Sequence, residues 1–279
     1  MRIFYSPKCL KYWQEGHPEG PERIKESYNI LKRYFDFSDA EPCSDDDLLL
    51  VHSKHLIEKI KKGEFYNHDT PNLSGIYEYA KLAAGSAILA IRFAIGGENS
   101  FSLMRPPGHH AGKDFLGGFC YFNNMAIAVE KALKILNKIA IIDIDGHHGN
   151  GTQDIFFGRK DVLYVSLHQK SAYPLTGFIS EKNCLNYPLA PGTKEDEYLE
   201  TLNKALESIV NFNPDLIAVS SGFDTYKNDP LLELELELRT FRNIGGMISE
   251  LEKPVSAILE GGYSKDLGKC IYQFLRGLD

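Results

Sequence analysis

The sequence predicts an α/β protein with a largely parallel central sheet. Short apolar runs alternate along the chain with longer stretches of helical periodicity, which is typical of strands joined by crossover helices. Runs such as IAII at 139–142 and LIAV at 216–219 are apolar at consecutive positions, so they suit strands that are covered on both faces. The 279 residues are enough for one domain with a sizeable core.

Each strand is expected where a short β-rich run ends in a turn rich in glycine, proline or histidine. The expected strands are Arg2–Tyr5, Ser100–Met104, Lys138–Ile144, Val162–His168, Asp215–Ser221 and Pro254–Glu260. Helices are expected between them, where apolar residues recur with helical spacing. The expected helices are Pro21–Phe35, Ser53–Lys62, Leu73–Ile95, Asn123–Leu136, Glu195–Phe212, Leu232–Leu251 and Lys265–Leu278. No repeat or linker interrupts this pattern, so residues 1–279 are predicted to form a single domain.

The composition excludes several classes of protein. Apolar residues make up 43% and charged residues 25%, which is ordinary globular usage and argues against a disordered, collagenous or coiled-coil chain. No apolar run approaches the ~20 residues that a membrane helix needs. Pro7 and Lys8 come before any signal-type apolar stretch could form, so a cytoplasmic location is expected.

Charge and cysteine usage narrow the choice of partners and cofactors. The net charge is −7, and no basic run is longer than the pair Lys61-Lys62, which argues against a nucleic-acid binder. The odd number of widely spaced cysteines, with no C-x-x-C pair, is typical of reduced and mostly buried thiols. They are Cys9, Cys43, Cys120, Cys184 and Cys270.

Polar residues beside glycines follow four of the expected strands. Because ligand sites in open α/β sheets form beyond the carboxyl ends of the strands, these four loops are expected to meet at one site. The loops are RPPGHH at 105–110, DIDGHHGNG at 143–151, GFD at 222–224 and EGGY at 260–263.

Asp143, Asp145 and His147 have the spacing i, i+2, i+4, which places all three on one side of an extended chain. Carboxylate and imidazole groups together suit a divalent first-row metal, with Asp224 from another strand end as a further ligand. A set of two carboxylates and one histidine leaves a coordination position open, as in catalytic sites.

This segment also has other interpretations. Taken alone, Asp145-Gly146 is equally compatible with an ordinary turn. An EF-hand loop starting at Asp143 would need glycine at its sixth position, where His148 stands. A phosphate-binding P-loop at 149–152 lacks the required lysine.

His109-His110 and Tyr263 are the candidate proton carriers and hydrogen-bond donors. Imidazole titrates near neutral pH, so the paired histidines could carry protons beside a metal-bound water, although such a pair alone is more often structural. Tyr263 follows two glycines and could direct its hydroxyl at a developing oxyanion, although a single tyrosine more often covers a core edge.

Together these motifs resemble the zinc-dependent histone deacetylase family, whose relatives include bacterial acetoin-utilisation and acetylpolyamine amidohydrolase proteins. The matching motifs run in the family's order from HPEGPER to EGGY, so the resemblance spans nearly the whole chain. They are HPEGPER (17–23), DTPN (69–72), RPPGHHA (105–111), GFCYFNN (118–124), DIDGHHGNGTQ (143–153), VSLH (165–168), NYPLAPGT (186–193), GFDTYKNDP (222–230) and EGGY (260–263).

The resemblance implies an arginase-like α/β fold and one zinc ion held by Asp145, His147 and Asp224. It also implies that His110 is the general base, that His109 is its electrostatic companion and that Tyr263 polarises the substrate carbonyl. Asp143 looks like the family's acid behind His109. Asn150 stands where some members have aspartate behind the second histidine; the asparagine form is familiar in the class II-like branch and should leave His110 less basic.

The same resemblance implies a substrate channel. Phe119 and Tyr173 match its two aromatic walls, and Asp69 matches an acid that holds the substrate backbone. A monovalent cation such as K⁺ is expected in a structural site. Its expected ligands are Asp143, Asp145, His147, Ser166 and Leu167.

The expected activity is zinc-dependent hydrolysis of N-acyl amides of lysine side chains, which releases a carboxylate, most simply acetate, and a free amine. The alternatives are an acetylpolyamine amidohydrolase and a non-catalytic acyl-lysine or metal-binding module; the second would have no evident use for His110 and Tyr263. The binuclear ureohydrolases share the fold, but they need further aspartates where this chain has Gly149 and Tyr226. The oligomeric state stays open.

Leu231 favours acyl-lysine over acylated polyamine. In a polyamine-selective branch of the family a glutamate follows the Asp-Pro pair, whereas here Leu231 follows Asp229-Pro230. Glu233 lies two residues further on and could supply the missing charge if the loop bends.

Overall fold

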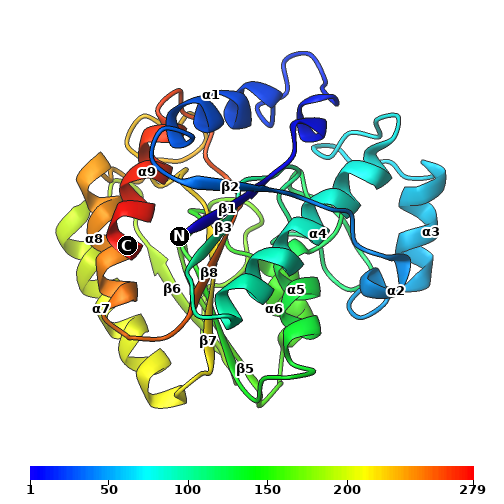
Figure 1. Cartoon of the computed structure of the whole chain (residues 1–279). Coiled ribbons are helices and arrows are strands. Elements are labelled where there is room, and N and C mark those ends of the chain that lie inside the picture. The colour runs from blue at the N-terminus through cyan, green and yellow to red at the C-terminus, as the bar shows by residue number, and fades with distance from the viewer.

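The computed structural model describes residues 1–279, and its centre is one sheet of eight strands in the order β2-β1-β3-β8-β7-β4-β5-β6 (Figure 1). Every neighbouring pair is parallel, which confirms the predicted α/β class with a parallel sheet. The strands are β1 (Arg2–Tyr5), β2 (Asp36–Asp39), β3 (Ser100–Ser102), β4 (Ile139–Asp143), β5 (Val162–Gln169), β6 (Cys184–Leu189), β7 (Leu216–Ser221) and β8 (Val255–Leu259).

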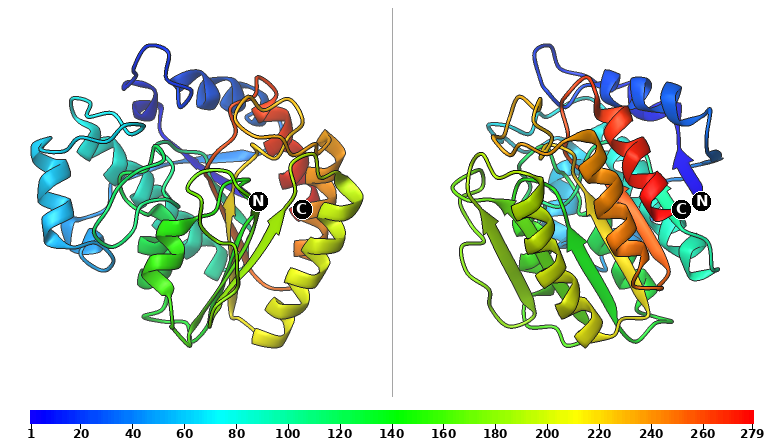
Figure 2. Two further views of the ribbon diagram at one scale, coloured as in Figure 1. Left: turned by 180° about the vertical axis from the view of Figure 1, so that it is seen from behind. Right: turned by 90° about the vertical axis from the view of Figure 1, so that its left-hand side faces the viewer.

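Helices cover both faces of this sheet. They are the short 3₁₀ helix η1 (Pro7–Leu10), α1 (Pro21–Leu31), α2 (Asp45–Leu48), α3 (Lys54–Lys62), α4 (Ile76–Ile95), α5 (Asn124–Ala132), α6 (Asn150–Phe156), α7 (Glu195–Phe212), α8 (Leu238–Ser249) and α9 (Leu267–Leu278). Helices α7, α8 and α9 lie together over one face in Figure 2, whereas α4 and α5 pack on the other.

Alternation along the strands explains this layering. Side chains of a strand point to opposite faces in turn. Ile142 and Val219 belong to the hydrophobic cluster that includes α7, α8 and α9, and their neighbours Ile141 and Ala218 belong to the cluster that includes α4 and α5. The central strands therefore bury apolar side chains on both faces of the sheet.

The two edge regions of the sheet contain strands that the sequence analysis did not predict. β2 (DFSD) is short and polar, and β6 (CLNYPL) is only partly buried and contains Pro188. Edge strands have one free side, so they tolerate polar residues and proline that would not suit the centre of a sheet. Neither run therefore carries the apolar signature on which the prediction relied.

The helix predicted over Leu232–Leu251 is wrong in its first part, because α8 begins at Leu238. Residues 231–236 are not helical; Leu234 and Leu236 are buried, whereas Glu233 and Glu235 are exposed. The LELELE pattern has a period of two, which indicates extended chain and not a helix. Smaller differences affect other predicted bounds: α1 and α5 end earlier, α4 and α9 begin later, and β3 is shorter.

Other features of the chain agree with the expectations. All five cysteines are free and buried. None of the helices combines the length and apolar character that crossing a membrane requires. The two termini lie side by side (Figures 1 and 2), and the amino group of Met1 is 3.8 Å from Oδ1 of Asp279.

Candidate active site

Three metal-ligand candidates converge beyond the carboxyl ends of β4 and β7. These strands are neighbours whose register pairs Asp143 with Ser220, so the loop with Asp145 and His147 faces the loop with Asp224. Nδ1 of His147 lies 2.7 Å from Oδ2 of Asp224 and 3.3 Å from Oδ1 of Asp145. One ligand atom from each of the three residues lies within 4.8 Å of the others.

This trio fits a divalent cation. Asp145 and Asp224 are fully buried, and their ion-pair partners are the histidines 109 and 147, with no lysine or arginine. Burial, reinforced by the charge of Asp145, raises the pKa of Asp224 to about 7. Two buried carboxylates this close need a compensating positive charge, which a metal ion would supply.

Backbone groups hold the two carboxylates in place. The N–H of Gly261 donates to Oδ2 of Asp145 at 2.7 Å, and the N–H of Gly146 donates to Oδ1 of Asp224 at 2.7 Å. Gly222 is required here, because a Cβ at this position would collide with the carboxylate of Asp145. The glycines beside the acids therefore make room for the site.

The two adjacent histidines have different partners. Nδ1 of His109 donates to Oδ2 of Asp143 at 3.1 Å, whereas Nδ1 of His110 donates to Oδ1 of Asn150 at 2.8 Å. Burial opposes the charged form of His109, but Asp145 and Asp143 outweigh it and raise its pKa to about 10. Burial, together with the neighbouring histidines, lowers the pKa of His110 well below its usual value. The arrangement leaves Nε2 of a neutral His110 free to accept a proton.

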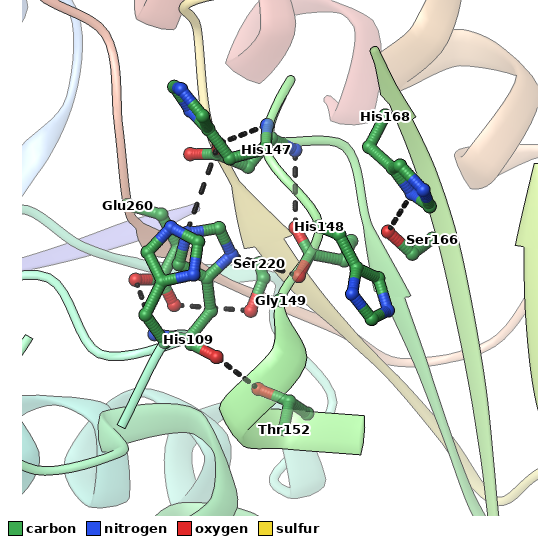
Figure 3. A network of polar contacts seen from close by, with 12 residues as sticks. His109, His147, His148, Gly149, Thr152, Ser166, His168, Ser220 and Glu260 are labelled. Carbon is green, nitrogen blue, oxygen red and sulfur yellow. Dashed lines mark hydrogen bonds and ion pairs between the residues drawn. The ribbon is translucent and has the colours of Figure 1, made fainter. Parts of the chain in front are cut away.

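A buried carboxylate that the sequence analysis did not single out supports this histidine loop. Oε2 of Glu260 accepts the N–H groups of Gly108 at 2.7 Å and His109 at 3.2 Å, and Oε1 accepts the hydroxyl of Ser220 at 3.1 Å. Burial raises the pKa of Glu260 to about 7. Figure 3 shows Glu260 and Ser220 beside His109, with Thr152 bonded to the carbonyl of His109 on its other side.

Arg23 and Asp229 orient Tyr263, and the sequence analysis did not assign either of them to the site. The guanidinium of Arg23 lies over the ring of Tyr263, 4.6 Å from its centroid, and Nε donates to the carbonyl of Gly262 at 2.6 Å. Oδ2 of Asp229 accepts the N–H of Tyr263 at 2.6 Å. Arg23 lies within the motif HPEGPER, but only the fold brings it to a residue far along the chain.

The predicted channel residues line one cavity of about 440 Å³ together with the histidines and Tyr263. The ring of Phe119 lies edge-on to Tyr263 at 5.7 Å, and Tyr173 lies edge-on to His110 at 5.0 Å between ring centroids. Oδ1 of Asp69 accepts the N–H of Gly118 at 2.9 Å. Asp69 and Leu231 line the same cavity. Its volume is in the range of small-molecule sites.

The residues expected to bind a monovalent cation are neighbours in the sheet and the following loop. The register of β4 on β5 pairs Asp143 with Ser166, and Leu167 comes next in β5. Ser166 also contacts Nδ1 of His168 at 2.9 Å (Figure 3). Cation binding at this position stays a prediction.

Comparisons with known proteins agree with the geometry. Residues 17–278 match the family model for the histone deacetylase domain. The chain is 38% identical over its full length to a probable deacetylase of Methanothermobacter thermautotrophicus, with 91% of that protein covered. A histone deacetylase-like amidohydrolase of Pseudomonas aeruginosa is 38% identical over 90% of the chain and 73% of its own length.

A solved structure is also similar to this chain in its fold. The acetylpolyamine aminohydrolase of Burkholderia pseudomallei has a TM-score of 0.89 and 27% identity, over 99% of this chain and 98% of its own. Fold, site and relatives therefore lead to one conclusion: the chain belongs to the histone deacetylase family of deacetylases and amidohydrolases.

Proposed function

We propose that this protein is a zinc-dependent amidohydrolase that removes acyl groups, acetyl in the simplest case, from lysine side chains. The observation that carries the proposal is that Asp145 and His147, with Asp224 within ligand distance of both, lie at one cavity with His110 and Tyr263. A zinc ion held by Asp145, His147 and Asp224 would lower the pKa of a bound water and polarise the substrate carbonyl.

The protein's own groups supply the proton transfers. Nε2 of His110 accepts a proton from the attacking water, and Asn150 keeps the imidazole in the tautomer that allows this. The hydroxyl of Tyr263 donates a hydrogen bond to the oxyanion that forms when the C–O bond is made. The C–N bond then breaks, and protonated His110 returns a proton to the departing amine, so the products are a carboxylate and a free amine.

Two substrate classes compete for this site. The apolar Leu231 at the cavity favours acyl-lysine, because it leaves no carboxylate at the position where polyamine-selective relatives have one. Acetylated polyamine is the second candidate, since Glu233 lines the same cavity and a relative of the same fold is named as an acetylpolyamine aminohydrolase. Comparing kcat/KM for an acetyl-lysine peptide with that for N-acetylspermidine decides between them.

The catalytic roles are tested with Tyr263→Phe and His110→Ala. Loss of one oxyanion donor typically lowers kcat by about 10²- to 10³-fold, and loss of the base should have an effect of similar or larger size. Tyr272→Phe, on α9 outside the cavity, is the matched control and should keep full activity. Elemental analysis should give one zinc per chain in all three variants. Tyr263→Phe with more than half of the activity would contradict the assigned role.

A further inference from the structure

Large apolar side chains are concentrated on the surface of one short stretch, residues 173–179, which we call the apolar segment. Thirteen such side chains are exposed in the whole chain, and four of them belong to these seven residues. They are Tyr173 (43% exposed), Leu175 (63%), Phe178 (47%) and Ile179 (68%). Single exposed apolar residues are common on soluble proteins, whereas a group of them is typical of an interaction site.

Polar contacts anchor the apolar segment to buried groups. The hydroxyl of Thr176 is hydrogen-bonded to Nδ1 of His148 at 2.7 Å, and Nε2 of His168 donates to the carbonyl of Gly177 at 3.1 Å. Both histidines are buried, and their ring centroids are 4.8 Å apart (Figure 3). The segment thus directs its polar contacts inward and its large apolar side chains outward, which is the opposite of the usual arrangement at a surface.

The backbone of the apolar segment is fixed in this conformation. Leu175 has φ +64°, in the left-handed region that is unfavourable for leucine, and its N–H donates to the carbonyl of Ala172 at 2.8 Å. Gly177 passes so close to the buried histidines that a Cβ there would lie 2.6 Å from the ring of His148. The exposed surface is therefore preformed, so little conformational freedom is lost when a ligand binds it.

The apolar segment begins at the substrate cavity. Tyr173 lines this cavity, and so does Leu231, another exposed apolar side chain. The Cα atoms of Tyr173 and Leu175 are at most about 7 Å apart, because consecutive Cα atoms are separated by about 3.8 Å. An extended peptide advances about 3.3 Å per residue. When an acyl-lysine enters the cavity, the one or two residues beside it therefore come within reach of the segment.

We propose that the apolar segment binds apolar side chains that flank the acyl-lysine of a peptide or protein substrate. The inference rests on the proposed amidohydrolase function and names the substrate as a polypeptide, since a small acylated amine has no flanking residues. Contact with Leu175, Phe178 and Ile179 removes apolar surface of both partners from water. Because this contact is remote from the reacting bond, it is equally strong before and during the reaction, so it lowers KM and leaves kcat unchanged.

The test uses two acetyl-lysine peptides that differ only in the residues on both sides of the acetyl-lysine, which are leucine in one and serine in the other. For the wild type, kcat/KM should be about 5- to 10-fold higher for the leucine peptide, the effect of partly burying one apolar side chain. In Leu175→Asn this ratio should fall by about 3-fold or more through a change in KM. Asparagine tolerates the left-handed conformation, so the backbone should be preserved.

Ile179→Thr is a second variant of the apolar segment, and Ile135→Thr is its matched control. Ile135 is 70% exposed, close to the value for Ile179, but it precedes β4 at the edge of the sheet opposite to the site. Ile179→Thr should lower the ratio, whereas Ile135→Thr should keep the wild-type ratio. Nε-acetyl-lysine amide, which has no flanking residues, should be hydrolysed equally well by the wild type and all three variants, which also shows that they are folded.

The outcomes separate the inference from the function on which it rests. Equal kcat/KM for the two peptides in the wild type, an unchanged ratio in both variants of the segment, or hydrolysis of small substrates alone would overturn the inference and leave the amidohydrolase intact. A wild-type dimer that becomes a monomer in Leu175→Asn, measured by sedimentation velocity, would also overturn it, because the segment would then join two copies of the chain. If the zinc-loaded protein hydrolysed neither an acetyl-lysine compound nor N-acetylspermidine, the proposed function itself would fail.

Discussion

His109 and His110 show how one residue behind an imidazole decides its chemistry. The two rings are neighbours, with centroids 4.0 Å apart, yet Asp143 stands behind the first and Asn150 behind the second. A carboxylate favours the charged imidazole, whereas an amide oxygen orients the ring without adding charge. Asp143 thus favours the charged form of His109, whereas His110, with its lowered pKa, is neutral and can accept a proton.

Asn150 is the residue to change in order to test this division. Asn150→Leu removes the acceptor for Nδ1 of His110, so the ring loses its preferred tautomer and orientation; kcat should fall about 10- to 100-fold, as for other residues that orient an active-site histidine. Asn150→Asp restores an acceptor and should keep kcat much closer to that of the wild type. Steady-state kinetics on zinc-loaded protein checks both, and an Asn150→Leu enzyme at wild-type speed would disprove the orienting role.

The elements that were predicted well are those whose burial follows a regular pattern along their length. Strands β4, β7 and β8 are buried on both faces and are therefore mostly apolar. The bounds of α7 were predicted correctly because one face of this helix is regularly apolar. The edge strands and the short helices α2 and α6 depend on tertiary contacts more than on their own composition, so local pattern could not reveal them.

The position of the site was predictable for a topological reason, because parallel strands place their following loops at one edge. The residues that support the site were not. Arg23 reaches Gly262 across 239 positions, and Glu260 holds the backbone of His109 across 151 positions. Contacts of this kind join α1 and the loop after β3 to the loop that follows β8, and a local stretch of sequence does not reveal such pairings.

His52, which contacts the start of α5, is expected to make the stability of the protein depend on pH. His52 is buried between two backbone groups: Nδ1 donates to the carbonyl of Gly112 at 2.9 Å, and Nε2 accepts the N–H of Asn123, the N-cap of α5, at 2.9 Å. The second contact requires the neutral ring, because a protonated Nε2 cannot accept a hydrogen bond. Burial lowers the pKa of His52 from 6.5 to about 4.

The direction of this dependence follows from proton binding. Between pH 6.5 and about 4 the unfolded chain binds a proton at His52 that the folded protein excludes, so the stabilising contribution is complete above pH 6.5 and is lost as the pH falls. The loss should amount to about 3 kcal/mol. Urea unfolding at a series of pH values should show a shallower acid dependence for His52→Gln than for the wild type, and an unaltered one for the exposed control His55→Gln. Parallel curves for all three proteins would refute the prediction.

At the scale of the whole molecule, both hydrophobic clusters are built on the same eight-stranded sheet. Neighbouring residues of each central strand belong to different clusters, so neither cluster can form without the sheet. The N-terminal strand β1 lies inside the sheet between β2 and β3, and the C-terminal helix α9 packs against α8 and α1. We propose on these grounds that the chain is a single domain that unfolds cooperatively.

Metal removal tests that cooperativity and the metal site in one experiment. Without a cation, Asp145 and Asp224 remain as two buried carboxylates in close proximity, which disfavours the folded state. A ligand present at 100 times its dissociation constant stabilises a protein by about 2.7 kcal/mol, and for a chain of this size each kcal/mol shifts Tm by about 2 °C. Chelation should therefore lower Tm by about 5 °C, and added zinc should restore it.

The whole transition should move as one step, because a single domain has one midpoint. In Asp224→Asn the chelator should leave Tm unchanged, since the trio is incomplete and one of the two buried charges is gone. Two separate transitions would disprove the single domain, whereas a wild-type Tm that stays constant while analysis shows loss of metal would disprove the coupling between the trio and folding.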